Sequence, residues 1–292
     1  MSSLKELRSR RKSVQSTKKI TAAMKLIAAA KLRYAQSRIQ SSRHYAEALA
    51  GMMQGLLQAK EFLSASRPLL SGRENPVTHL YIIATSDRGL CGGFNSSIVR
   101  RALKLMNDSK NRGQKIKVIV IGRRGYDQIK RSYESSIVER HPAYGKPLYR
   151  DATTISANLI KMFNDLVFDE CTIVYNQFIS ALSQKVTHKQ LIPIVRSPLT
   201  NVQDIMLSAA LEFEPSEEDV LDALIPKNLS VQIFNVLLEN AASEQGARMT
   251  AMDSATRNAE DMIKNLDLTY NRTRQSYITK ELIEIISGAE AL

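Results

Sequence analysis

The sequence is short of several residue types, and each shortage narrows what the protein can be. It has no tryptophan, two cysteines and no run of eighteen apolar residues, so nothing in it predicts a membrane-spanning helix. Cys91 and Cys171 have no histidine or second cysteine beside them, which argues against a metal site and favours a reducing compartment or no redox role. The histidines also lack any catalytic or metal-binding spacing: His44, His79, His141 and His188. We therefore expect no metal and no cofactor, and we give an enzyme site little weight.

Acidic residues are scarce at the N-terminus. Residues 1–45 hold twelve lysines and arginines but a single acid, Glu6, so this segment carries +11 of the net charge of +12. Three interpretations are open: a solvated helix face, which is the default, a nucleic-acid-binding helix, or a surface for acidic protein loops. The nucleic-acid interpretation is weakened because only Tyr34 and Tyr45 interrupt the charges with aromatic rings.

Proline is missing from long stretches at both ends. No proline occurs before Pro68 or after Pro226, and apolar residues in both stretches recur at three- and four-residue steps. This pattern predicts one long helix over residues 3–60 and another, about 90 Å long, from Pro226 to Gly288. Each has a narrow apolar seam, so we expect the two helices to pair as an antiparallel coiled coil.

The middle of the sequence has a different pattern. Short apolar runs of the kind found in buried parallel strands alternate with helical stretches Ser96–Asn107, Gly125–Tyr133 and Thr154–Phe168. The runs are His79–Ser86, Ile116–Gly122, Cys171–Gln177 and Gln190–Val195. We predict an α/β fold combined with a long antiparallel coiled coil, in three parts: an N-terminal helix over 1–62, a small Rossmann-like domain over 77–197, and a C-terminal helix over 207–292.

The segment Ser86–Asn95 joins the first predicted strand to a helix and contains three glycines. Loops at this place in α/β domains often hold phosphate, but the segment matches neither of the common glycine-rich phosphate motifs. A structural turn or a protein contact is therefore favoured over nucleotide binding. A small nucleotide-dependent enzyme built on residues 77–197 is kept as a further alternative. We interpret Cys91 as a small buried residue in preference to a nucleophile.

Four motifs together resemble the gamma subunit, the central rotor shaft, of rotary F-type ATP synthases. They are Thr17–Lys25 with Ala28–Lys31, Ser86–Asn95, Ser243–Asp253 and Asn271–Gly288, and they cover nearly the whole chain in the family's order. The sequence of the last motif most closely resembles that of the alphaproteobacterial and mitochondrial branch of the family. The absence of a transit-like extension before the first motif favours a bacterial chain.

The resemblance implies a non-catalytic subunit of a larger enzyme. The paired helices are expected to stand inside the ring of alpha and beta subunits, with the α/β domain beside the epsilon subunit and on the membrane rotor ring. The implied function is to couple ion-driven rotation to sequential changes at the beta catalytic sites. The implied location is peripheral, on the cytoplasmic face of the bacterial inner membrane. The alternative is a basic coiled-coil protein that binds nucleic acid.

The resemblance also implies contact residues, position by position. Arg248, Gln275, Thr279 and Glu281, with Arg274 beside them, match positions that contact the beta subunit. Lys18, Met24 and Lys25 match the part of the first helix that faces an acidic loop of beta. Phe213 and Glu214, in a looser motif, match the contact with the rotor ring.

Overall fold

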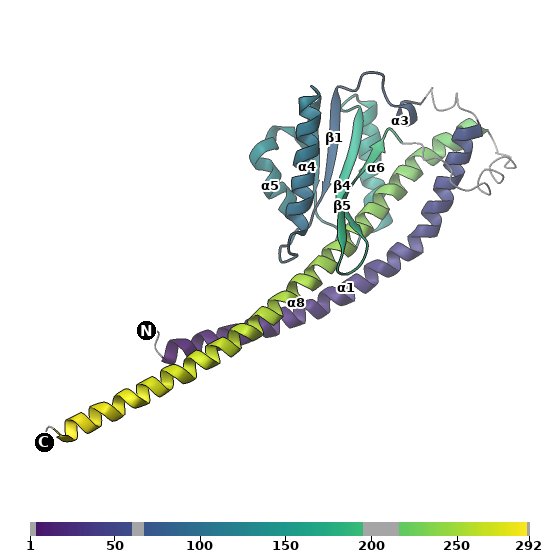
Figure 1. Ribbon diagram of the computed structural model, residues 1–292. Coiled ribbons are helices and arrows are strands. Elements are labelled where there is room, and N and C mark those ends of the chain that lie inside the picture. The colour runs from purple at the N-terminus through teal and green to yellow at the C-terminus, as the bar shows by residue number, and fades with distance from the viewer. Residues whose placement is uncertain (1–3, 60–66, 195–215, 291–292) are drawn as a thin grey trace. The chain divides into compact units, whose positions relative to one another are not determined.

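The computed structural model describes residues 4–59, 67–194 and 216–290 (Figure 1). They form two compact units: a terminal unit, which is the chain up to Ala28 together with the chain from Arg248 onward, and a central unit, Ala29–Ala247. No helix among these residues is long and apolar enough to cross a membrane.

The two long predicted helices are present. Helix α1 spans Leu4–Ala59 and helix α8 spans Glu217–Glu290. Alanine-rich sequence without proline supports α1, whereas α8 includes Pro226 in its early part. The predicted C-terminal helix starts at residue 207, and residues 207–215 lie outside the described part of the chain. The 74 residues of α8 correspond to a length of about 110 Å.

The central unit contains a five-stranded sheet in the order β3-β2-β1-β4-β5. Strands β1 (Thr78–Ala84), β2 (Lys115–Ile121), β3 (Ile137–His141) and β4 (Glu170–Phe178) are parallel. The sequence pattern did not predict β3, because only two of its five residues are apolar.

Strand β5 (Gln184–Ile192) corrects the prediction of a fourth parallel strand over Gln190–Val195. It starts earlier and pairs antiparallel with β4. The chain returns from β4 through a short turn, and a parallel partner would need a long crossover connection instead. Only Leu191 and Ile192 of β5 are fully buried, and the apolar run that was recognised consists of these two residues and the apolar residues that follow the strand.

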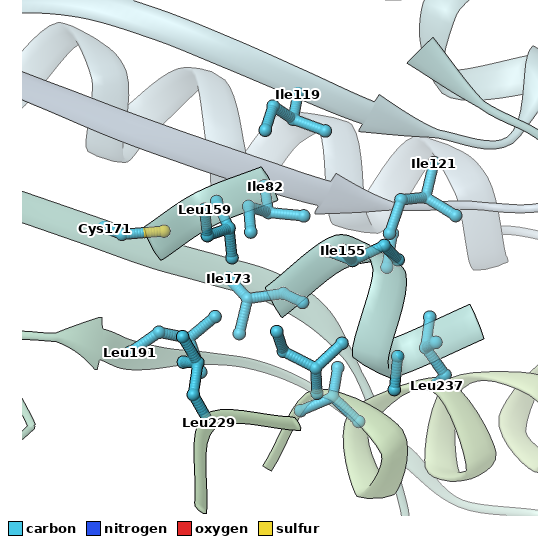
Figure 2. Close-up of a cluster of buried hydrophobic side chains, with 14 of the residues drawn as sticks. Ile82, Ile119, Ile121, Ile155, Leu159, Cys171, Ile173, Leu191, Leu229 and Leu237 are labelled. Carbon is cyan, nitrogen blue, oxygen red and sulfur yellow. The ribbon is translucent and has the colours of Figure 1, made fainter. Parts of the chain in front are cut away.

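Helices cover both faces of the sheet. Helices α4 (Phe94–Asn111) and α5 (Arg123–Tyr133) pack on the face that carries Tyr81, Ile83 and Val120. Helix α6 (Tyr149–Asn164) and part of α8 pack on the other face, and Figure 2 shows that cluster. Its members include Ile82, Ile119, Ile155, Leu159, Ile173 and Leu237. Side chains of successive strand residues point to opposite faces, so both faces of these strands are apolar.

The end of α1 packs against the beginning of α8 within the central unit. Leu49 and Met53 of α1 share a buried cluster with Leu221 and Ile225 of α8. Further along the same pair of helices, the hydroxyl of Ser42 donates a hydrogen bond of 3.1 Å to the Asn235 side chain. A short helix α3 (Pro68–Ser71) contributes Leu70 to this cluster.

Candidate interaction site

In the terminal unit, α1 and α8 form an antiparallel pair with a thin apolar seam. The buried seam residues are Leu7, Thr21 and Ala28 on α1, and Met252 and Ala259 on α8. On each helix these positions are separated by seven residues or a multiple of seven, which is the repeat of a coiled coil. The predicted antiparallel coiled coil is therefore confirmed for this unit.

Three ion pairs run beside the seam, and we call them the ion-pair ladder. Arg11 pairs with Asp267 at 2.7 Å, Lys18 with Glu260 at 2.5 Å, and Lys25 with Asp253 at 2.6 Å. Each step of seven residues forward on α1 matches seven residues backward on α8. The hydroxyl of Thr256 donates to that of Thr21 at 2.8 Å between two steps of the ladder. Polar contacts thus supplement the small apolar area of this seam.

Acidic pH combined with added salt is expected to loosen this helix pair. Hydrogen bonds from Lys25 and Arg257 lower the pKa of Asp253, and one from Lys18 lowers the pKa of Glu260. A carboxylate with a lowered pKa stabilises the fold above its ordinary pKa, and that contribution is lost as the pH falls through the lowered value. The stabilisation by these carboxylates should therefore be lost below about pH 4, and salt should screen the attraction between charges that remains.

Spin labels on Ser9 and Thr269, both exposed, measure this change, since both native cysteines are buried. The distance distribution between the labels should be narrow at pH 7 and broad at pH 3 in salt. The variant Asp253→Asn, Glu260→Gln, Asp267→Asn imitates the protonated ladder, so its distribution should already be broad at pH 7. A variant that stays narrow at pH 7 would show that these carboxylates do not hold the helices together.

Beyond its partner helix, α8 continues alone. The guanidinium of Arg8 reaches the hydroxyl of Tyr270 at 3.4 Å, and α1 begins only one turn earlier, at Leu4. The last four to five turns of α8 therefore have no partner helix among the described residues of this unit, and Figure 1 shows α8 continuing past the start of α1. Ile278, Leu282 and Ile285 are 55%, 56% and 71% exposed. The sequence predicted that the whole C-terminal helix, to Gly288, pairs with the N-terminal helix. That prediction was wrong for these residues, because α1 begins at Leu4 and does not reach them.

The Ser86–Asn95 loop is held by its own side chains. The Asn95 amide oxygen accepts a hydrogen bond of 2.9 Å from the Ser86 backbone N–H, and Cys91 is 2% exposed. The Asp87 carboxylate accepts hydrogen bonds from the backbone N–H groups of Arg123 and Ala143, at 2.9 and 3.1 Å. Arg123 is the first residue of α5 and Ala143 follows β3, so the Asp87 carboxylate ties the loop to two neighbouring segments of the central unit. This geometry supports the structural turn.

Helix α8 also lies at the carboxyl ends of the parallel strands, where α/β domains commonly bind ligands. The Asn240 side chain accepts a hydrogen bond from the backbone N–H of Asn176 in β4, and the Ser243 hydroxyl donates to the Asn176 carbonyl oxygen. These contacts lie near the carboxyl end of β4, next to β1, where the order of connections reverses. The described residues contain no group of three or more side chains suited to a metal ion.

Comparison with known proteins agrees with the motifs. The ATP synthase family model matches residues 3–292. The chain is 47% identical to the ATP synthase gamma chain of Rhodospirillum rubrum and 48% identical to that of Parvibaculum lavamentivorans, with all of each chain covered. The chain belongs to the ATP synthase gamma-chain family. The relatives with this level of identity are mostly alphaproteobacterial, as the sequence of the last motif predicted.

Solved structures share the fold of this gamma-chain family member. One is the central stalk and c-ring of the Tetrahymena thermophila mitochondrial ATP synthase, at 26% identity and a TM-score of 0.63, covering 81% of this chain and 99% of the other. Another is the Euglena gracilis mitochondrial ATP synthase, at 20% identity and a TM-score of 0.71, covering 99% and 94%.

Within this gamma-chain fold, the predicted contact residues fall in different surroundings. Arg274, Gln275, Thr279 and Glu281 all lie exposed on the unpaired end of α8, while Arg248 and Met24 are half-buried. Lys18 and Lys25 belong to the ion-pair ladder, which the motif comparison did not reveal. The sequence contains a signal for these pairs, since the bases and the acids are each spaced by seven residues, but the spacing alone does not say which base meets which acid. Phe213 and Glu214 lie outside the described residues.

Proposed function

We propose that this chain is the non-catalytic central rotor subunit of an ATP synthase. It couples ion-driven rotation of a membrane ring to sequential changes at the catalytic sites of beta subunits, and it runs in reverse during ATP hydrolysis. The observation that carries the proposal is the match to gamma chains over the full length of the chain. A long helix that extends beyond its partner with an exposed apolar face supports it, because such a face requires a surrounding partner.

The proposed mechanism is differential contact. A ligand shifts an equilibrium between two conformations only by the difference of its affinities for them. A shaft that presents different side chains in different directions contacts each of the surrounding beta subunits differently at any moment. Turning the shaft then moves the favoured conformation from one beta subunit to the next.

The end of α8 has the surface composition that this role needs. At 100° per residue, Ile278, Leu282 and Ile285 share one face of the helix. Gln275 and Thr279 border this face on one side, and Arg274 and Glu281 border it on the other. An apolar centre with polar margins is the arrangement found in protein interfaces. We propose that these four residues and Arg248 contact beta, together with Lys18, Met24 and Lys25 of α1.

The remaining partners follow from the proposed role. They are the alpha and beta subunits of the head, the epsilon subunit and the membrane rotor ring, with Phe213 and Glu214 at the ring. The similar Tetrahymena and Euglena chains come from assemblies that include a c-ring, and the latter also includes F1. We place the chain peripherally on the cytoplasmic face of a bacterial inner membrane, without a cofactor. Residues 1–62 and 207–292 form the shaft, and residues 77–197 form the foot.

Reconstitution tests the proposal. The purified chain alone should hydrolyse no ATP, and adding it to alpha and beta subunits of the same organism should produce cooperative ATPase activity. Alpha and beta mixed without the chain provide the baseline, and single-molecule rotation of a bead on the chain provides a second measurement. Assembly that left both turnover and rotation at the baseline would contradict the proposed function.

A further inference from the structure

Strand β4 extends beyond its partner β1, and helix α8 completes the hydrogen bonds that this leaves open. The parallel pairing of the two strands ends where Ile83 lies opposite Val174. Two residues further on, the backbone N–H of Asn176 donates to the Asn240 side chain at 3.2 Å, and its carbonyl oxygen accepts from the Ser243 hydroxyl at 2.9 Å. All three residues are buried, where unpaired backbone groups are costly, so these contacts fix α8 on the end of β4.

The turn between β4 and β5 meets α8 at a second point. A β-carbon at Gly246 would lie 3.2 Å from the carbonyl oxygen of Ala181, so any larger side chain would require the turn to move. The Gln184 side chain closes this turn by donating to the same carbonyl oxygen at 3.1 Å. Because Gly246 follows Ser243 by about one helical turn, the two contacts succeed each other along α8.

Asn176 also connects α8 to the segment Ser86–Asn95. Its side-chain amide donates to the carbonyl oxygen of Phe94 at 3.5 Å, at the start of α4. The same segment is tied to the start of α5 through the Asp87 carboxylate. The end of β4 is therefore held from the side of the sheet as well as from α8. We call five residues the α8 lock: Asn176, Ala181, Asn240, Ser243 and Gly246.

The α8 lock occupies the last turns of α8 that belong to the central unit. The helix then continues without a break from Ala247 to Arg248, where the terminal unit begins. Before the lock, α8 packs on the sheet through apolar side chains such as Leu229, Ile233 and Leu237. Apolar contacts are not directional, so they hold a helix on a sheet without fixing how far it is turned about its own axis. Hydrogen bonds are directional and do fix that angle.

We propose that the α8 lock sets the rotational position of α8 on the central unit and is the place where torque passes between the foot and the shaft. Asn240 and Ser243 are positioning residues for the proposed coupling function, on which this inference rests. Torque on the far end of α8 turns the helix about its axis, and the lock transmits this turn to β4. The Ser86–Asn95 segment supports the joint, which gives this motif a role that needs no ligand.

The test compares two double variants of α8 that carry the same kinds of substitution. The first, Asn240→Leu, Ser243→Ala, removes both directed contacts with β4. The control, Asn228→Leu, Ser230→Ala, replaces buried residues of the same types, whose side chains bond within α8 and to Ser156 of α6. Each chain is assembled into the complete ATP synthase in lipid vesicles, where ATP hydrolysis and ion pumping are measured. Thermal unfolding of each free chain is followed by circular dichroism.

The lock variant should hydrolyse ATP as the control does but pump fewer ions for each ATP, because the shaft turns without carrying the foot fully with it. A role in stability alone would lower hydrolysis and pumping in proportion and leave their ratio unchanged. Equal numbers of ions per ATP in the two variants would overturn the inference and leave the proposed function intact. If the complex with the unsubstituted chain shows neither cooperative hydrolysis nor pumping, the proposed function fails.

A disulfide provides a second test that does not depend on weakening the fold. In the variant Ala181→Cys, Gly246→Cys, the β-carbon of residue 246 would lie 3.6 Å from the α-carbon of residue 181, a separation that a disulfide can bridge. If the turn and α8 move as one body, oxidation should leave hydrolysis and pumping as they are in the reduced state. Gly246→Cys alone, treated in the same way, is the control. Activity that falls on oxidation of the double variant and returns on reduction would contradict the inference, because the turn and α8 would then move against each other during rotation.

Discussion

Replacing Ile278, Leu282 and Ile285 by glutamine is expected to weaken binding to the alpha–beta complex roughly a hundredfold. The three side chains are more than half exposed in the free chain and lie on one face of α8. Burying the exposed part of each should contribute about 1 kcal/mol, and about 3 kcal/mol together corresponds to this loss of affinity. Glutamine is a good helix former, so the helix itself should persist.

The same variant should keep the thermal unfolding curve of the unsubstituted chain, because these side chains have no partner among the described residues of the terminal unit. Calorimetric titration gives the affinity, and circular dichroism gives the unfolding curve. A matched control replaces Val77, Leu166 and Leu182, which are 51%, 73% and 80% exposed in the central unit, by glutamine. Equal losses of affinity in both variants would mean that general surface hydrophobicity, and not the end of α8, drives assembly.

Replacing Gly122 by alanine is expected to lower the free energy of unfolding of the central unit by about 4 kcal/mol. Gly122 joins β2 to α5 with a φ of +94°, a conformation that residues with a side chain rarely adopt. A β-carbon at this position would lie 2.6 Å from the carbonyl oxygen of Thr85. The obstacle is backbone, in the loop that follows β1, and it cannot move aside as the end of a side chain can.

Gly113→Ala is the matched control for backbone conformation alone. Gly113 has a φ of +82°, but a β-carbon there would have no neighbouring heavy atom within 4 Å. This control should lose only about 1 kcal/mol. Urea unfolding of both variants, followed by circular dichroism, measures the difference between them. Similar losses in the two variants would show that the contact with Thr85 relaxes easily, which would contradict the prediction.

The prediction of the sheet from the sequence was correct where strands are buried on both faces and incomplete elsewhere. Strands β1, β2 and β4 appear as continuous apolar runs because helices cover both of their faces. Strand β3 lies at an edge with an alternating pattern, so a short polar sequence forms a strand only because β2 offers it hydrogen bonds. The direction of β5 depends on the short turn after β4, which the apolar run over Gln190–Val195 does not contain.

The sequence by itself determined the two long helices, their seams, the α/β class of the middle and the family. These follow from local periodicity, scarcity of proline and contiguous motifs, all of which are properties of neighbouring residues. Only the tertiary structure decided how far α1 extends along α8, and therefore which apolar residues of α8 remain exposed. It also decided that Lys18 and Lys25 are paired with acids of α8. A seven-residue repeat fits its partner at several offsets, and contacts between residues far apart in the chain, such as Lys25 with Asp253, select one of them.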